Sequence, residues 1–297
     1  MNVTYRLLLL IFLSLWVEKN FGQELLKLWE PGTKPHYKEN SLQEFEKEEW
    51  GTMNAYHITE PTMTIYAAQG KNTGKSVLIL PGGGYRLVAI HHEGYDLAEV
   101  LSAQGITAAV LKYRLPDTLS SDAPHMVPLA DTRRALKILR TKAEAYSFDP
   151  AKVGVLGFSA GSHLATVASL WKSDESEENP NFSALIYGVT NLKADNMDWL
   201  EKSLYYRKMT AEEIEQNTLL NLVTEESPPA FLVHAYDDPV CHVTESTLYA
   251  QELFKQKVPV EMHLFPKGGH GFGMGRTKGG VSQWVQLFVN WLASADI

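Results

Sequence analysis

The chain has 297 residues, of which 44% are hydrophobic and 21% charged. This composition excludes an intrinsically disordered chain and supplies the core of one large globular domain or two small ones. The formal net charge of −8 argues against nucleic acid and anionic membranes as partners.

Residues 1–22 have the pattern of a secretory signal peptide. Arg6 precedes an apolar run at residues 7–16, and polar and small residues follow up to Gly22. A run of about ten apolar residues is too short to span a bilayer, which needs about twenty, so a membrane anchor is the less favoured alternative. We expect cleavage after Gly22, a secreted or periplasmic protein and no membrane insertion after signal removal. Cleavage leaves 25 basic and 34 acidic residues, a net charge of −9.

Cysteine and histidine usage predicts neither a disulfide nor a bound metal. Cys241 is the single cysteine, so no intrachain disulfide can form even where export would permit one. The chain has no His-Glu-x-x-His or Cys-x-x-Cys spacing. Residues 91–93, His-His-Glu, are the one alternative, but adjacent residues on a helix point in different directions. We therefore expect no metal and no cofactor.

Residues 23–61 are charged and aromatic, with prolines and glycines as breakers, and are predicted to form an N-terminal arm. From residue 62 to 297, short apolar runs alternate with amphipathic stretches. The expected strands are residues 63–67, 77–80, 107–111, 153–156, 184–189, 231–235 and 260–265. The expected helices are residues 93–103, 127–145, 162–171, 243–257 and 281–293. This alternation predicts an α/β fold with a mostly parallel central sheet and helices on both faces. Residues 190–227 interrupt it and are predicted to form a short helical cap insertion.

Residues 157–161, Gly-Phe-Ser-Ala-Gly, stand between an expected strand and an expected helix. This is the context of a nucleophile elbow, in which the strand turns so sharply that the serine is exposed above the sheet. Gly157 and Gly161 leave room where a Cβ would clash. Ser159 is therefore the candidate nucleophile.

Residues that can take part in catalysis follow three other expected strands. The carboxyl ends of the strands are the edge of the sheet at which ligands bind in this fold class. Residues 81–85, Pro-Gly-Gly-Gly-Tyr, offer bare backbone amides, although a flexible turn has the same composition. Asp237 and Asp238 follow the expected strand 231–235, where a turn with a helix cap is the alternative. His270 lies among glycines after the expected strand 260–265, where a surface histidine is the alternative.

Ser159, Asp238 and His270 occur in the chain order expected for this kind of elbow. In the predicted mechanism His270 takes the Ser159 proton as the hydroxyl attacks an acyl carbon, and Asp238 orients the imidazole. The amides of Gly83, Gly84 and Ala160 are the candidate oxyanion-hole donors.

Together these motifs resemble the α/β-hydrolase superfamily, within it the esterase and lipase branch whose loop reads His-Gly-Gly-Gly. The sequence is most similar to secreted bacterial carbohydrate esterases of the acetylxylan and feruloyl esterase type. The resemblance covers residues 62–293. Its motifs are residues 81–85, 113–115, 128–140, 157–161, 234–240 and 270–273. One departure is Pro81 in place of the histidine, which leaves open whether Gly83, Gly84 or Tyr85 supplies the amides.

The resemblance implies Asp238 as the acid, because it precedes a Pro-Val pair, and a loop-stabilising role for Asp237. It implies hydrolysis of acetyl or other small acyl esters on plant-wall carbohydrate. The substrate is then a small ester or an acylated oligosaccharide. Aromatic residues that can line its pocket or belong to the core are Tyr85, Trp199, Tyr205, Tyr206 and Phe272. Asp131 and Arg134, three residues apart on one expected helix, can form a structural pair.

Two other functions fit the same scaffold, because fold and triad are shared widely. One is a serine peptidase like prolyl oligopeptidase, although no propeller-sized domain precedes the hydrolase. The other is a non-catalytic carbohydrate-binding or adhesion module, although no member of the triad is lost. The acyl group, the sugar and the oligomeric state are left open by the sequence.

Overall fold

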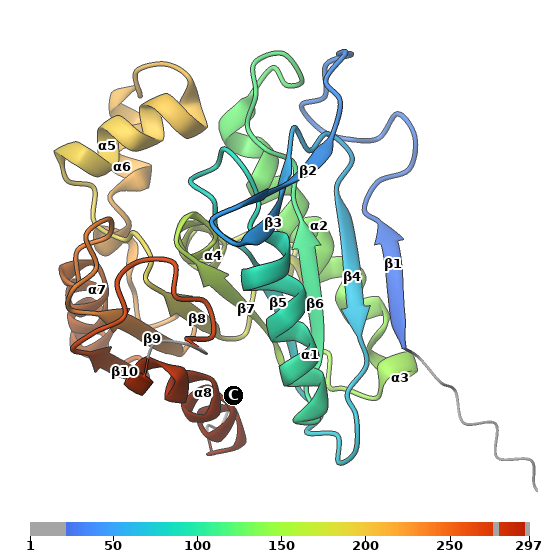
Figure 1. Cartoon of the computed structure of the whole chain (residues 1–297). Coiled ribbons are helices and arrows are strands. Elements are labelled where there is room, and N and C mark those ends of the chain that lie inside the picture. Colours follow the sequence, from blue (N-terminus) through green and yellow to red (C-terminus); the bar gives the residue numbers. More distant parts are fainter. Residues whose placement is uncertain (1–21, 276–278, 295–297) are drawn as a thin grey trace, which may run out of the picture.

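The computed structural model describes residues 22–275 and 279–294. An eight-stranded sheet runs through the centre of the protein (Figure 1). In spatial order its strands are β1 (Gln23–Lys27), β4 (Thr62–Tyr66), β6 (Thr107–Lys112), β5 (Ser76–Leu80), β7 (Val153–Phe158), β8 (Ser183–Ile186), β9 (Ala230–Ala235) and β10 (Val260–Phe265). The strands from β6 to β10 run parallel, whereas β1 and β4 join antiparallel. The predicted α/β class with a mostly parallel sheet is confirmed.

Helices cover both faces of the sheet, so its central strands are buried on both sides and are made mostly of apolar residues. Helices α1 (Asp96–Ala103) and α8 (Trp284–Ser294) lie on one face, and α2 (Val127–Thr141) and α4 (Ala160–Leu170) on the other (Figure 1). The remaining long helix, α7 (Thr244–Lys255), packs on β9 and β10. All residues of β5 and β7 are buried, as strands covered on both sides must be. A large core therefore holds the strand ends in fixed positions.

The segment predicted as an N-terminal arm contributes regular structure of its own. Strand β1 extends the sheet by pairing with β4, and β2 (Phe45–Glu49) and β3 (Thr52–Tyr56) form a separate hairpin. Trp50 and Gly51 make the two-residue turn of this hairpin. Strand β2 reads Phe-Glu-Lys-Glu-Glu and is almost fully exposed, so it lacks the apolar alternation that identifies a strand in sequence.

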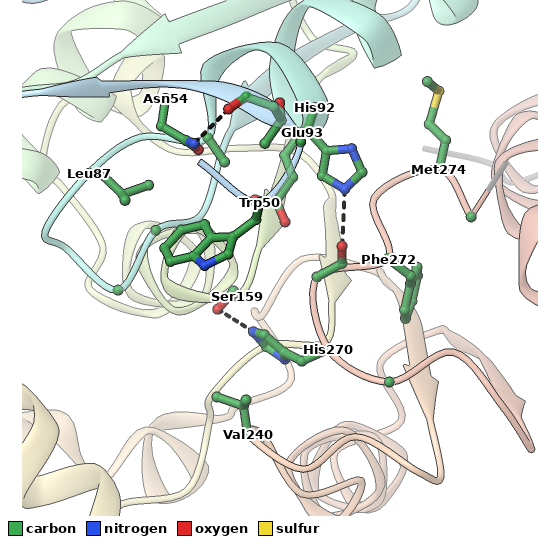
Figure 2. Close-up of a pocket in the computed structure, with 18 of the residues that line it drawn as sticks. Trp50, Asn54, Leu87, His92, Glu93, Ser159, Val240, His270, Phe272 and Met274 are labelled. Atoms are coloured by element: carbon green, nitrogen blue, oxygen red, sulfur yellow. Dashed lines mark hydrogen bonds between the residues drawn. The ribbon is translucent and has the colours of Figure 1, made fainter. Parts of the chain in front are cut away.

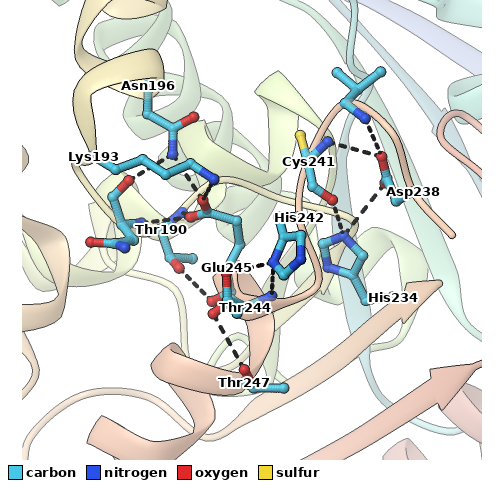
Figure 3. A network of polar contacts seen from close by, with 12 residues as sticks. Thr190, Lys193, Asn196, His234, Asp238, Cys241, His242, Thr244, Glu245 and Thr247 are labelled. Atoms are coloured by element: carbon cyan, nitrogen blue, oxygen red, sulfur yellow. Dashed lines mark hydrogen bonds and ion pairs between the residues drawn. The ribbon is translucent and has the colours of Figure 1, made fainter. Parts of the chain in front are cut away.

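Residues 190–227 form short helices beside the carboxyl edge of the sheet (Figure 1). These are α5 (Ala194–Leu200), η4 (Glu201–Tyr205), α6 (Ala211–Asn217) and η5 (Leu219–Leu222). The buried carboxylate of Glu245 on α7 holds the start of the segment (Figure 3). It accepts the amides of Thr190 and Asn191 at 2.9 and 2.8 Å and pairs with Lys193 at 3.2 Å. One fully buried acceptor thus fixes where the segment leaves the sheet.

Asp131 pairs with Arg114 and not with Arg134, so the predicted helical pair is wrong. The Arg114 guanidinium donates to both carboxylate oxygens at 2.7 to 3.1 Å, and both side chains are buried. Trp29 also donates to Asp131 at 2.7 Å, and Arg134 donates to the Leu28 carbonyl at 3.0 Å. Burial decides the outcome, because the fully buried Asp131 carboxylate needs several donors, whereas the half-buried Arg134 guanidinium is already engaged by the Leu28 carbonyl and the Trp29 ring.

Within residues 22–275 and 279–294, no helix is both long and apolar enough to cross a membrane. The predicted signal peptide, residues 1–22, lies outside the described residues except for Gly22.

Candidate active site

Ser159 lies in the sharp turn between β7 and α4. Its backbone has φ 50° and ψ −118°, a conformation that costs a non-glycine residue energy and that clusters at functional sites. The two glycines of the motif allow the turn. A Cβ on Gly157 would lie 2.2 Å from the Gly161 carbonyl oxygen, and a Cβ on Gly161 would lie 2.0 Å from the Leu80 carbonyl oxygen. Only glycine fits at either position.

Ser159, His270 and Asp238 form one hydrogen-bonded chain. The Ser159 hydroxyl lies 2.9 Å from Nε2 of His270 (Figure 2), and Nδ1 of the same ring lies 2.8 Å from Oδ2 of Asp238. A neutral imidazole with its proton on Nδ1 donates to the carboxylate and accepts from the serine. The arrangement can therefore remove the hydroxyl proton when Ser159 attacks an electrophilic carbon.

Asp238 is held ionised by the groups around it, two of which, His234 and Cys241, are drawn in Figure 3. Burial alone would raise its pKa, but hydrogen bonds from His234, His270 and the Val240 amide bring the pKa well below its ordinary value. His234 is fully buried, lies 3.4 Å from Oδ2 of Asp238 and also bonds to the Cys241 carbonyl at 2.8 Å. The carboxylate is thus negative and fixed in position beside the His270 ring.

Asp237 points to a different partner from its neighbour. Its Oδ1 accepts the amides of Gly268 and Gly269, each at 2.8 Å. These bonds lower the pKa of Asp237 and tie the end of β9 to the His270 loop, residues 266–275. The two adjacent carboxylates therefore have different partners. Asp238 binds the His270 imidazole, and Asp237 binds the loop that carries His270.

Residues 82–84, here called the glycine loop, lie directly against Ser159. The Gly82 amide donates to Glu93, so it is occupied. Within the part of the chain that the structure describes, the amides of Gly83 and Gly84 donate to no protein acceptor. The Ala160 amide is at the first position of α4, where an amide has no intrahelical acceptor. These three amides are available to a negatively charged oxygen above Ser159.

Glu93 connects the glycine loop to the His270 loop; the sequence pointed to it only as part of a less favoured metal site, not as a residue of the active site. Its Oε2 accepts the Gly82 amide at 2.6 Å, and its Oε1 accepts the Tyr187 hydroxyl at 2.6 Å. Tyr187 in turn accepts the Gly273 amide at 3.0 Å. The neighbouring His92 lies 3.0 Å from the Gly271 carbonyl (Figure 2). Residues 92 and 93 therefore brace the two loops that flank Ser159.

A cavity of about 1000 Å³ opens over Ser159. Its lining includes Gly83 and Gly84 of the glycine loop together with His270, Trp50, Val240 and Met274 (Figure 2). Phe272, a predicted pocket residue, lines this cavity but is only 2% exposed and packs against Tyr187. The volume is large enough for an ester with a bulky alcohol.

Tyr85, the other predicted pocket residue, is turned into the protein. It is 1% exposed, its hydroxyl lies 2.9 Å from Nδ1 of His163, and its ring stacks on Trp199. Burial lowers the pKa of His163 to about 4, so this pair is neutral near pH 7. Tyr85 therefore lies in the wall of a second cavity beside the glycine loop, to which it contributes little surface because it is almost fully buried.

Among the described residues, no group of three or more histidine, cysteine, aspartate or glutamate side chains is arranged to hold a metal ion. His91 faces Glu46 at 4.0 Å, whereas His92 and Glu93 contact the loops described above. The three consecutive side chains at residues 91–93 thus point to different partners.

Comparison with known proteins identifies relatives over most of the chain. An acetylxylan esterase from Xylanibacter ruminicola is 32% identical over 230 residues, which cover 75% of this chain and 46% of the relative. This chain therefore spans less than half the length of that protein. The structure of an acetyl ester-xyloside bifunctional hydrolase from Caldicellulosiruptor lactoaceticus matches with a TM-score of 0.75 at 29% identity, covering 91% of this chain and 96% of the other.

A second solved structure is MGS-M1, an α/β-hydrolase enzyme from a deep-sea metagenome of the Medee basin. It matches with a TM-score of 0.61 at 26% identity, covering 84% of this chain and 96% of the other. The family model of BD-FAE matches residues 63–253, from strand β4 to the last turn of α7. The chain belongs to the BD-FAE family and, as its sequence motifs predicted, to the α/β-hydrolase superfamily.

Proposed function

We propose that this protein is a serine carboxylic ester hydrolase that removes acetyl or other small acyl groups from plant-wall carbohydrate, with xylan-type esters as the substrate class. The observation that carries the proposal is the chain from Ser159 through His270 to Asp238 at the base of an open cavity.

In the proposed reaction Ser159 Oγ attacks the acyl carbon while Nε2 of His270 takes the hydroxyl proton. The resulting oxyanion is stabilised by the amides of Gly83, Gly84 and Ala160. His270 then gives the proton to the departing sugar oxygen, which leaves an acyl group on Ser159. Water, deprotonated by His270, releases the carboxylic acid and restores the serine. Asp238 remains ionised throughout and stabilises the charged imidazole.

The substrate class is supported by the relatives and by the charge of the site. One relative is named an acetylxylan esterase, and one structural neighbour is titled an acetyl ester-xyloside bifunctional hydrolase. The acidic residues Glu93, Asp96 and Asp237 belong to the lining of the cavity, so a neutral acylated sugar suits it better than an anionic ester. The signal-like pattern of residues 1–22 supports export, which would bring the enzyme to polymer fragments outside the cell.

Acetate release from acetylated xylo-oligosaccharides by wild type and Ser159→Ala tests the proposal. Ser176→Ala, an exposed serine on η3 (Ser176–Glu178), is the matched control. We expect release by wild type and the control and loss in Ser159→Ala. Turnover of a peptidyl-proline amide without ester turnover would favour the peptidase. Saccharide binding without any turnover would favour the binding module.

A further inference from the structure

Trp50 occupies a position that its backbone and its surroundings both disfavour. It has φ 54° and Gly51 has φ 74°, so the β2–β3 turn needs left-handed backbone at both central residues. Asparagine or glycine is usual there, and a bulky side chain adopts this conformation at a cost. The Trp50 side chain is nevertheless 81% exposed, so packing does not offset the strain. Strained backbone of this kind clusters at functional sites.

The hairpin brings Trp50 to the mouth of the Ser159 cavity (Figure 2). Trp50 also lines a second cavity of about 740 Å³. The two cavities share Trp50, Leu87, Val240 and the amide-bearing residues Gly83 and Gly84. The second cavity therefore adjoins the cavity over Ser159.

The lining of the second cavity combines aromatic rings with polar groups of both signs. The aromatic residues are Trp50, Tyr56, Tyr85, Trp199 and Tyr206, of which Tyr85 is almost fully buried, and the polar ones include Glu49, Arg86, Asp117 and Ser120. Tyr206 is 44% exposed and Trp50 81%, so both present ring surface to solvent. Rings offer a face to the C–H groups of a sugar, and mixed polar groups pair with its hydroxyls. This lining suits a neutral polyhydroxylated ligand.

We propose that the second cavity is a subsite for unacylated sugar units of the substrate chain, with Trp50 as its stacking surface. The proposal rests on the proposed ester hydrolysis, because it extends the same substrate away from Ser159. A chain that crosses the glycine loop places its ester at the nucleophile and its neighbouring sugar rings against Trp50. Longer oligosaccharides are then better substrates than single acetylated sugars.

Binding of xylotetraose to the Ser159→Ala protein, measured by titration calorimetry, tests the subsite without turnover. We expect added Trp50→Ala to weaken binding about tenfold, as the loss of one aromatic contact does, and added Trp50→Phe to restore most of it. Phe254→Ala on α7, an aromatic residue 77% exposed, is the matched control and should bind as the parent does. No binding, or equal binding with and without Trp50, would overturn the proposal.

Kinetics separates this subsite from the ester hydrolysis on which it depends. For Trp50→Ala we expect the ratio of kcat/KM on acetylated xylotetraose to kcat/KM on 4-nitrophenyl acetate to fall about tenfold. Trp50→Gly should give the same fall with an unchanged or higher Tm, because glycine relieves the left-handed strain. An unchanged ratio, or a lowered Tm in Trp50→Gly, would assign Trp50 a structural role. Absence of Ser159-dependent hydrolysis of both esters would instead remove the proposed function.

Discussion

Glu93 holds the glycine loop through a single buried carboxylate, so its replacement tests how far the loop geometry governs the rate. Its two oxygens each accept one donor at 2.6 Å, from the Gly82 amide and from the Tyr187 hydroxyl. In Glu93→Ala both donors lose their acceptor. In Glu93→Gln the amide oxygen still accepts from Gly82, and the Tyr187 hydroxyl can turn to accept from the new NH₂ group.

The expected magnitudes follow from these contacts. A hydrogen bond to a charged group contributes about 1.5 to 3 kcal/mol, and loss of one oxyanion donor costs about 3 kcal/mol of barrier. For Glu93→Ala we expect a loss of about 2 to 3 kcal/mol, which is about 30- to 150-fold in kcat. For Glu93→Gln, which keeps the shape and loses the charge, we expect about 1 kcal/mol, or about fivefold. KM should change little in either variant, because the oxyanion forms only in the reaction.

Steady-state kinetics on 4-nitrophenyl acetate, with Tm measured alongside, checks this expectation. Glu99→Ala, an exposed glutamate on α1, is the matched control and should retain wild-type kcat. The reasoning fails if Glu93→Ala keeps its kcat while folded. It also fails if Glu93→Gln is faster than wild type, because the carboxylate charge would then oppose the oxyanion more than its hydrogen bonds help.

Three other perturbations test neighbouring parts of the structure. Gly83→Ala should lower kcat about a hundredfold and also lower Tm, because the φ of Gly83 is 132° and a Cβ there would lie 2.1 Å from the Leu87 carbonyl oxygen. Full activity in this variant would contradict the expectation. Arg114→Met should lower the free energy of unfolding by about 3 kcal/mol, measured in urea, because the buried Asp131 carboxylate loses its cation. A loss below about 1 kcal/mol would show that this ion pair does not stabilise the fold. The pKa of His163 is about 4 in the folded protein, against an ordinary value of 6.5. As the pH falls, the unfolded chain therefore takes up a proton at this histidine before the folded protein does. The free energy of unfolding should drop by about 3 kcal/mol between pH 6.5 and 4. Urea unfolding across this range should show a smaller drop in His163→Gln, and an equal drop would count against the assignment.

The sequence predicted the fold class and the candidate nucleophile because these depend on local patterns. Continuous apolar runs identified the buried strands, and the glycines of residues 157–161 are required by carbonyl oxygens about 2 Å from their missing Cβ atoms. The chain order of Ser159, Asp238 and His270 fitted one kind of elbow. The structure brings these three side chains together.

Features that depend on distant contacts were not predictable in the same way. Glu93 lies 94 residues from Tyr187, and nothing in the run at residues 91–93 indicates this partner. The β2–β3 hairpin carries charged residues where a strand pattern expects alternation, so Trp50 appeared as part of an arm. Asp131 pairs with Arg114 instead of Arg134, because a buried contact between distant parts of the chain forms in place of the contact that the helical spacing suggested. In each case a long-range contact decides the role of the residue.

Intact-mass analysis during turnover of 4-nitrophenyl acetate, followed by peptide mapping, shows whether Ser159 is the residue that carries the acyl group. We expect a mass increase of one acetyl group that maps to Ser159 in rapidly quenched wild type and is absent from Ser159→Ala. Acetyl transfer to another residue, or unchanged ester turnover by Ser159→Ala, would contradict this expectation.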